Sequence, residues 1–346
     1  MKIVKRDQKI GLVVARAENL DDLWYLAQVI DEGDVVKART LRLVKGKDDK
    51  MRAGKGEKKP MTLAIRVEKA EFDQNANKLR ILGIIEAGPD EYISLGSHHT
   101  LEVDEHDKLD IFKKSWTQSD LQYLRDAEKS AKSAKVAICI IGDGEATLAL
   151  VRDRGLHYID TSENIGGKYI EGREKNKKEF YSKLLELLNE EVKKGVQSII
   201  VGGPGFEKRN FADYAKGKIN LQVVDTGNEG KQGVHEILKG TALEKVLGDA
   251  RIAREARLME RLEEELSKDN LAAYGIEEVR RAVEMGAVEV LLILDKKLRE
   301  NRGEIERLIS HAKKTQSEFH ILNSNFDPGQ KLEGLGSIAA ILRYKI

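Results

Sequence analysis

Cysteine is almost absent from this sequence of 346 residues, in which Cys139 is the only one. One thiol cannot form an intramolecular disulfide, and it cannot build a zinc site of several cysteines. Cys139 lies in the apolar run VAICIIG, which predicts a buried strand residue. The sequence therefore excludes a fold held together by disulfides or by cysteine-bound zinc.

Long apolar runs are missing as well. No stretch approaches the ~20 apolar residues that a helix needs to span a bilayer. The first residues, MKIVKRDQKIGLVV, also lack the apolar core of a signal peptide. We therefore expect a cytoplasmic protein with no membrane partner.

A net excess of either charge is missing too. The sequence has 60 Lys and Arg against 59 Asp and Glu, which gives a formal net charge of +1. A nucleic-acid partner would have to bind local basic patches, because the molecule as a whole is not a polycation. Charged residues make up 34% of the chain and apolar residues 40%, so we expect globular domains with a mixed-charge surface. A chain of this length predicts two or three domains.

Residues 1–130 show the alternation of half-buried strands and form the first predicted domain. Two helices are predicted here. The first has a buried face that consists of Leu23, Leu26, Ala27 and Ile30, and the second begins near Thr117 and leads to the end of the domain. A short helix among several strands predicts a small β-barrel. The predicted strands are KIGLVVAR, GDVVKARTLRLV, MTLAIRVEKAEF and KLRILGIIEA.

Residues 131–246 form the second predicted domain, which mixes helices and strands. The stretch GDGEAT lacks the Gly-Lys-Ser/Thr of a phosphate-binding loop, so we interpret it as the turn of a β-hairpin. The chain is therefore not expected to be a GTPase itself. The predicted strands that follow are VQSIIVG and LQVVDTG. The predicted helix between them and the hairpin has a buried face made of Phe180, Leu184, Leu188 and Val192.

Residues 247–346 form the third predicted domain. A long charged helix leads into it, and helices and strands then alternate. This order predicts a compact α/β sandwich. The alternating segments are GIEEVRRAVEMG, AVEVLLILD, IERLISHAKKT, EFHILN and GSIAAILRY.

Five stretches, taken together and in order, resemble the Pelota family of ribosome-rescue factors, which are relatives of the class I release factors. They cover all three predicted domains, and no one of them is diagnostic alone. The lack of an acidic C-terminal tail favours an archaeal member. The stretches are GDVVKARTLR, GSHHTLEVDEHDKLDIFKKSW, GEATLALV, VGGPGFEKRNF, and AAYGIEEVRRAVEMGAVEVLLILD with the terminal LRY.

The resemblance implies both a fold and a function. The fold is an Sm-like β-barrel that binds RNA, a central α/β domain like domain 2 of release factors, and a C-terminal α/β sandwich like small kink-turn-binding ribosomal proteins. The function is recognition and rescue of stalled ribosomes in mRNA surveillance, known as no-go decay. The implied partners are the stalled ribosome with its mRNA, an elongation factor 1 alpha-like GTPase and an ABC-type recycling ATPase. The resemblance implies a monomer that needs no cofactor for rescue.

The loop ENIGGKYIEG aligns with the place where release factors carry the catalytic Gly-Gly-Gln. The family usually has Pro-Gly-Lys-Arg here, so Gly167 and Lys168 keep the pattern while Gly166 and Tyr169 depart from it. A glutamine amide can donate to an oxyanion and accept from water, whereas a protonated lysine can only donate. We therefore expect no peptidyl-tRNA hydrolysis. Gly167, Lys168 and the nearby Arg173 either contact phosphates or an acidic surface, or belong to a solvated loop.

The Pro-Gly-Phe turn is implicated in this family in contacting the GTPase. The resemblance transfers this role to Pro204, Gly205 and Phe206, with Lys208 beside them. A rigid turn that presents an aromatic side chain makes a plausible binding hot spot. The alternative is that Phe206 folds back into the core.

A basic, glycine-containing stretch lies between two predicted strands at residues 45–59. Seven basic and three acidic residues give it a net charge of 7 − 3 = +4. Such a hairpin suits contact with RNA phosphates, although a charge run is more usually only solvated. With the resemblance, we predict RNA or ribosome contact by Lys45, Lys47, Lys50, Arg52, Lys55, Lys58 and Lys59.

The resemblance also leaves open a second activity, a divalent-metal-dependent endoribonuclease in the N-terminal domain that cleaves stalled mRNA. Such cleavage needs carboxylates clustered around one or two hard cations. The candidate catalytic residues are Glu18, Asp21 and Asp22, near the start of the first helix. Helix capping and the helix dipole already explain acidic residues at this place, and we favour that explanation.

Overall fold

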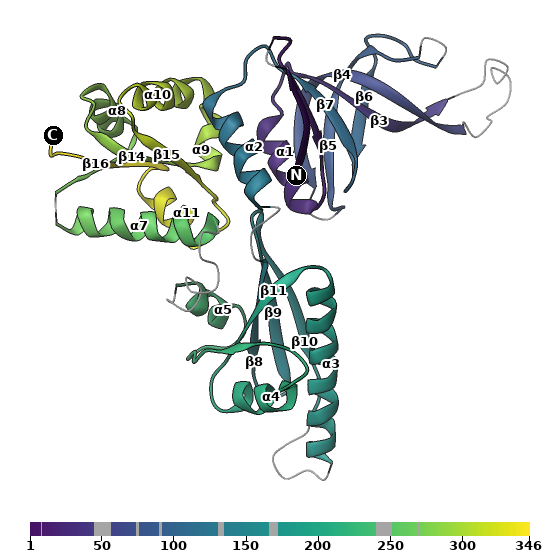
Figure 1. Cartoon of the computed structure of the whole chain (residues 1–346), viewed down its shortest axis with the longest axis vertical. Coiled ribbons are helices and arrows are strands. Elements are labelled where there is room, and N and C mark those ends of the chain that lie inside the picture. The colour runs from purple at the N-terminus through teal and green to yellow at the C-terminus, as the bar shows by residue number, and fades with distance from the viewer. Residues whose placement is uncertain are drawn as a thin grey trace. The chain divides into compact units, whose positions relative to one another are not determined.

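A computed structural model of the chain describes residues 1–7, 9–44, 57–73, 76–89, 92–130, 135–165, 172–239, 251–268 and 270–346 (Figure 1). The chain divides into two compact units, Met1–Lys132 and Ser133–Ile346. The second unit contains two separate sheets, which correspond to the second and third predicted domains. The predicted boundary after residue 246 lies outside the described residues.

The first unit is built on a seven-stranded sheet in the order β1-β2-β7-β3-β4-β5-β6, with all neighbours antiparallel. Its strands are β1 (Lys2–Asp7), β2 (Leu12–Arg16), β3 (Val35–Val44), β4 (Glu57–Asp73), β5 (Lys78–Ala87), β6 (His98–Val103) and β7 (Lys108–Phe112). Although β4 and β5 separate β3 from β6 in this order, Thr40 Oγ1 of β3 lies 3.1 Å from His99 Nε2 of β6. The sheet therefore coils upon itself, as a barrel requires.

Two helices, α1 (Leu20–Val29) and α2 (Gln118–Ser130), complete the first unit. The predicted single buried face of α1 is too narrow, because Trp24 and Tyr25 are buried along with Leu23 and Leu26. The rings of Trp24 and Tyr25 pack edge to face with Tyr123 of α2, with ring centres 6.3 Å away in both pairs. The two helices therefore share one aromatic core.

The middle sheet has five strands in the order β10-β9-β8-β11-β12. Its strands are β8 (Lys135–Ile141), β9 (Glu145–Arg152), β10 (Gly155–Ser162), β11 (Val196–Gly202) and β12 (Gln222–Val223), and its helices are α3 (Arg173–Lys193), α4 (Glu207–Ala215) and α5 (Gly230–Lys239). The predicted hairpin is confirmed, since β8 and β9 pair antiparallel around the Gly-Asp-Gly-Glu turn. Cys139 is fully buried in β8, as predicted, and burial raises the pKa of its thiol to about 12.

The predicted buried face of α3 is correct for Phe180, Leu184 and Leu188 and wrong for Val192, which is 41% exposed. The inward position of this last turn belongs to Glu191, which is 3% exposed. Its carboxylate lies 2.7 Å from Lys194 Nζ, within the same helix end. A buried charge with a local partner thus replaces the expected aliphatic contact.

The third sheet has four strands in the order β13-β16-β14-β15. Its strands are β13 (Ala272–Tyr274), β14 (Val288–Leu294), β15 (Glu318–Leu322) and β16 (Ile338–Leu342), and its helices are α7 (Arg251–Ser267), α8 (Ile276–Glu284), α9 (Asp295–Glu300), α10 (Arg302–Lys314) and α11 (Asp327–Gly334). Helices α8 and α10 cover one face of the sheet, and α7 and α11 the other (Figure 1). The predicted α/β sandwich is confirmed.

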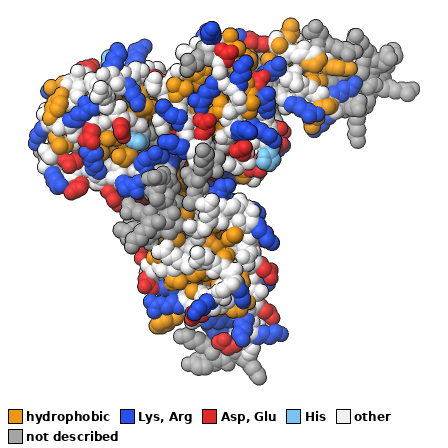
Figure 2. Space-filling model, in the orientation of Figure 1, with side chains coloured by type: hydrophobic (Ala, Val, Ile, Leu, Met, Phe, Trp, Pro, Cys, Tyr) orange, Lys and Arg blue, Asp and Glu red, His pale blue; other side chains and the backbone are white. Residues whose placement is uncertain are grey.

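The visible face of the molecule carries Lys and Arg side chains interspersed with Asp and Glu (Figure 2). This pattern agrees with the near-zero net charge and with the expected mixed-charge surface. Among the described residues, no helix is both long enough and apolar enough to cross a membrane.

Candidate functional site

The turn between β11 and α4 presents an aromatic side chain to solvent. Phe206 is the N-cap of α4 and is 74% exposed, so the alternative in which it packs into the core is wrong. Gly203 has φ 138°, and a Cβ atom built on it would lie 2.1 Å from the carbonyl oxygen of Ile141. Gly205 has φ 66°, in the left-handed region that favours glycine. The Gly-Gly-Pro-Gly-Phe sequence therefore produces a tight turn with its phenylalanine outward.

Lys208, which is predicted to bind the GTPase, lies beneath this turn. The residue is 4% exposed, and its ammonium Nζ donates to the carbonyl oxygens of Gly203 and Gly205, at 2.7 and 2.8 Å. Nζ also lies 3.0 Å from Asp225 Oδ1. Because its donors are used inside the protein, Lys208 supports the turn and is not available for direct contact with a partner.

The central loop is described only at its end. Gly167 and Lys168 lie outside the described residues. Arg173, the first residue of α3, donates from Nη2 to Asp143 Oδ1 at 2.5 Å, and Asp143 lies in the turn between β8 and β9. This contact fixes the start of α3 to the hairpin.

Most of the predicted basic hairpin also falls outside the described residues, namely Lys45, Lys47, Lys50, Arg52 and Lys55. Lys58 and Lys59 lie on β4, which begins at Glu57. The ammonium of Lys59 lies 4.8 Å from the centre of the Tyr92 ring, in a cation–π contact. These two lysines therefore lie on a described strand, at the C-terminal end of the basic stretch in the sequence.

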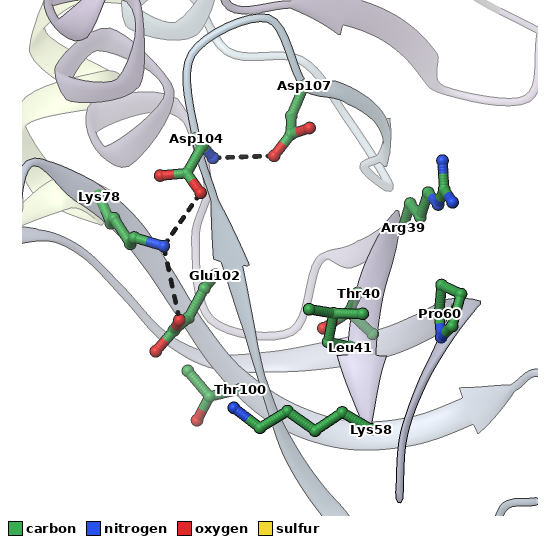
Figure 3. Close-up of a pocket in the computed structure, with 10 residues that line it drawn as sticks. All are labelled: Arg39, Thr40, Leu41, Lys58, Pro60, Lys78, Thr100, Glu102, Asp104 and Asp107. Atoms are coloured by element: carbon green, nitrogen blue, oxygen red, sulfur yellow. Dashed lines mark hydrogen bonds and ion pairs between the residues drawn. The ribbon is translucent and has the colours of Figure 1, made fainter. Parts of the chain in front are cut away.

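Lys58 lines an open groove of about 530 Å³ on the first sheet (Figure 3). It extends along the groove toward Thr100 of β6, while Arg39 of β3 lies at the other end. The residues around the groove are Arg39, Thr40, Leu41, Lys58, Pro60, Lys78, Thr100, Glu102, Asp104 and Asp107. Lys78 neutralises part of the acidic wall, since its Nζ lies 3.0 Å from Asp104 Oδ2 and 3.8 Å from Glu102 Oε2.

Arg39 and Lys78 were not among the predicted contact residues. Arg39 lies on β3, which pairs directly with the β4 strand of Lys58, whereas Lys78 lies on β5 and lines the same groove because the sheet coils. For Arg39, the signal that could have found it is the run of basic residues in GDVVKARTLR. The groove combines cations suited to phosphates with carboxylates that can accept from base amino groups.

One of the proposed nuclease carboxylates, that of Asp22, is used in hydrogen bonds at the start of helix α1. Asn19 Oδ1 accepts from the backbone N–H of Asp22 at 3.1 Å, and Asp22 Oδ2 accepts from the N–H of Glu18 at 2.7 Å. The other oxygen of Asp22 lies 2.6 Å from the α-amino group of Met1, and both groups are fully buried. An ammonium therefore occupies the place where a metal would have to bind Asp22.

Glu18, Asp21 and Asp22 belong to no cluster of three or more metal-ligand side chains among the described residues. Asp21 is 7% exposed, so it too lies inside the protein rather than facing an RNA. These residues do not fit a divalent-metal site, and no cleavage step can be derived from them.

Three family profiles match the chain in order. The Pelota N-terminal domain matches residues 1–128, eRF1 domain 2 matches residues 135–249 and eRF1 domain 3 matches residues 252–346. Together they cover all three sheets described above.

Full-length relatives agree with these profiles. The protein pelota homologs of Thermococcus onnurineus and Pyrococcus furiosus are each 38% identical to this chain, and each alignment covers 100% of both proteins. The crystal structure of the Thermoplasma acidophilum Pelota protein is 26% identical, covers 100% of both chains and superposes with a TM-score of 0.74. The chain belongs to the Pelota family.

Proposed function

We propose that this chain recognises and rescues stalled ribosomes in mRNA surveillance. It enters a vacant A site with an elongation factor 1 alpha-like GTPase, and it then helps an ABC-type ATPase to separate the subunits. The observation that carries the proposal is the full-length match to the family, domain by domain. A chain that retains every domain of a family in order retains the domains that carry the family's binding surfaces.

The exposed Phe206 turn supports the part of the proposal that concerns the GTPase. An isolated phenylalanine that is 74% exposed on a constrained turn has no role in the core. Its transfer into a partner pocket would contribute about 1.5–3 kcal/mol of binding free energy. Because the turn is already fixed by Lys208, little conformational entropy is lost when the partner binds.

The first sheet supports the part that concerns RNA. Arg39, Lys58 and Lys59 offer cations on ordered strands, next to the basic residues of the stretch 45–56. Arginine and lysine contacts to phosphates give affinity without sequence preference. Rescue of ribosomes stalled on unrelated messages needs such sequence-independent binding.

The same proposal assigns GTP and ATP hydrolysis to the partners and no peptide release to this chain. Lys168 cannot replace the glutamine amide of a release factor. We expect rescue to require no cofactor bound to this chain, which acts as a cytoplasmic monomer.

A subunit-separation assay tests the proposal. Archaeal ribosomes stalled with an empty A site are incubated with the chain, the GTPase, the ATPase and both nucleotides, and the subunits are resolved on a sucrose gradient. We expect separation that depends on the chain, with the peptide still attached to its tRNA. Separation at the same rate without the chain, or release of the free peptide, would contradict the proposal.

A further inference from the structure

Glu207, the residue directly after Phe206, is held by two side chains of α3. Its Oε2 accepts from the hydroxyl of Tyr181 at 2.6 Å, and its Oε1 accepts from Lys177 Nζ at 2.7 Å. Tyr181 is 4% exposed, and the side chains of Lys177 and Glu207 are only 15% and 20% exposed. Hydrogen bonds to a charged group with little access to water are stronger than surface ones.

The hydroxyl of Tyr181 is a fixed and permanent donor. Its ring packs edge to face on Phe211 of α4, with ring centres 5.5 Å apart. Burial, together with the Glu207 carboxylate, raises the pKa of the hydroxyl far above its ordinary value. Tyr181 therefore stays protonated and donates to Glu207 across the whole physiological pH range.

The side of α3 that carries Lys177 and Tyr181 makes a second contact, at the start of the helix. Arg173, Lys177 and Tyr181 follow one another at intervals of four residues, which places them along one side of the helix. Arg173 binds Asp143 in the hairpin turn, and the other two bind Glu207. The first turns of α3 thus connect the β8–β9 turn to the start of α4.

Because Phe206 is 74% exposed, the direction of its side chain depends largely on how its backbone is held. Its backbone is held on one side by Lys208, through the carbonyl oxygens of Gly203 and Gly205. The other side is held through Glu207 and the first hydrogen bonds of α4, in which the Phe206 carbonyl oxygen accepts from the N–H groups of Arg209 and Asn210 at 3.0 Å.

We propose that Glu207, held by Tyr181 and Lys177, is a positioning residue for the GTPase: it fixes the direction of Phe206 without touching the partner. The inference rests on the proposed function, because the GTPase is the partner that binds the turn. A preformed turn binds more tightly than one that must be ordered on binding. Linkage is reciprocal, so binding at Phe206 in turn stabilises the contacts of α3 with Glu207.

The key variant is Tyr181→Phe, which removes only the hydroxyl and keeps the packed ring. Tyr214→Phe is its matched control: Tyr214 lies in the same aromatic cluster, 5.5 Å from Tyr181, and its hydroxyl has no hydrogen bond with any described residue. Both variants keep the charge and volume of the cluster. A loss shared by both would reflect general loosening of the ring packing and would overturn the proposal.

Hydrogen exchange in the free chain gives a readout that needs no partner. In Tyr181→Phe we expect the amides of Arg209 and Asn210 to exchange about tenfold faster, which corresponds to the loss of one hydrogen bond to a charged group. The amides of β11, and all amides in Tyr214→Phe, should keep their wild-type rates. Unchanged exchange at Arg209 and Asn210 in Tyr181→Phe would overturn the proposal.

Affinity for the GTPase, measured by calorimetry, tests whether Glu207 and Tyr181 influence partner binding. Tyr181→Phe should weaken binding about fivefold, and it should have no further effect in the Phe206→Ala background, because it acts only through that side chain. Full additivity would mean direct contact with the partner and would overturn a positioning role. A wild-type chain that binds no GTPase would overturn the proposed function, whereas the exchange rates would still decide whether Glu207 holds the turn.

Discussion

Lys208 donates from its buried ammonium to the carbonyl oxygen of Gly205, 2.8 Å away, and thereby holds the turn that exposes Phe206. This lysine is only 4% exposed and donates hydrogen bonds to the backbone instead of facing solvent. The charge is compensated by Asp225 at 3.0 Å. Lys208 inside the turn and Phe206 at its tip therefore belong to one structure. Substitutions of the two residues should nevertheless differ in their effects on stability and on GTPase affinity.

Phe206→Ala should weaken GTPase binding by about 2 kcal/mol or more while leaving the melting temperature unchanged. The side chain is 74% exposed, so its removal creates no cavity in the core. Calorimetric titration and a thermal melt measure the two quantities. Val223→Ala, which trims another exposed apolar side chain of the same domain, is the control and should change neither. A lowered melting temperature with unchanged affinity would contradict the assignment.

Lys208→Met should lower both the stability of the chain and its affinity for the GTPase. The carbonyl oxygens of Gly203 and Gly205 lose their donor, which costs about 1–3 kcal/mol of unfolding free energy. The turn also loses its support, so GTPase affinity falls with it. Arg209→Met is the matched control, because Arg209 is exposed and lies 3.7 Å from the same Asp225. Equal stability losses in the two variants, by chemical denaturation, would show that Lys208 has no special role.

Lys58→Glu combined with Lys59→Glu should weaken ribosome binding and flatten its salt dependence. Each lost phosphate contact lowers the slope of log K against log salt by about 0.7–0.9. The double arginine variant at these positions keeps the charge and should keep the slope. Binding measured by filtration from low to high salt distinguishes the cases, and an unaltered slope in the glutamate variant would show that these lysines do not touch RNA.

Cys139 should make stability depend on pH in the alkaline range. Burial raises the pKa of its thiol to about 12 in the folded chain, from an ordinary value of 9.0. Below pH 9 the thiol keeps its proton in both the folded and the unfolded chain, so its contribution to the free energy of unfolding does not change with pH. Between these two values the unfolded chain loses the proton while the native chain keeps it, so stability falls by about 1.4 kcal/mol per pH unit.

Denaturation of the wild type and of Cys139→Ala between pH 7 and about pH 11 isolates this contribution. The difference in unfolding free energy between the two should be constant up to about pH 9 and should shrink above it. A difference that stays constant over the whole range would mean that the thiol ionises as easily in the native chain as in the unfolded one.

The spacing of apolar residues in the sequence predicted those helices and strands in which the buried residues have the same spacing. Strand β5 alternates as expected, with Leu79 and Ile81 buried, and β14 is apolar and buried from Val290 to Leu294, as a central strand should be. Strand β1 escaped prediction because it lies at the edge of its sheet and its residues are mostly exposed. The sequence of such a strand carries almost no apolar pattern to detect.

Side-chain direction was the part of the site that sequence could not supply. Phe206 and Lys208 are two residues apart, and residue type alone suggested a buried aromatic and an exposed lysine as the simple alternative. The structure has the reverse, because the carbonyl oxygens of Gly203 and Gly205 converge beneath the turn and a lysine is long enough to reach both. Likewise, the groove around Lys58 exists only because the sheet coils.

The central claim is that this chain, together with its GTPase, binds ribosomes whose A site is empty. The most direct measurement is co-sedimentation with two matched sets of ribosomes, one stalled with a vacant A site and one with that site occupied by tRNA, in the presence of the GTPase and a non-hydrolysable GTP analogue. We predict that the chain sediments with the vacant set and not with the occupied set, and that Phe206→Ala loses the GTPase from the complex. Equal binding to both sets, or binding to neither, would contradict the account.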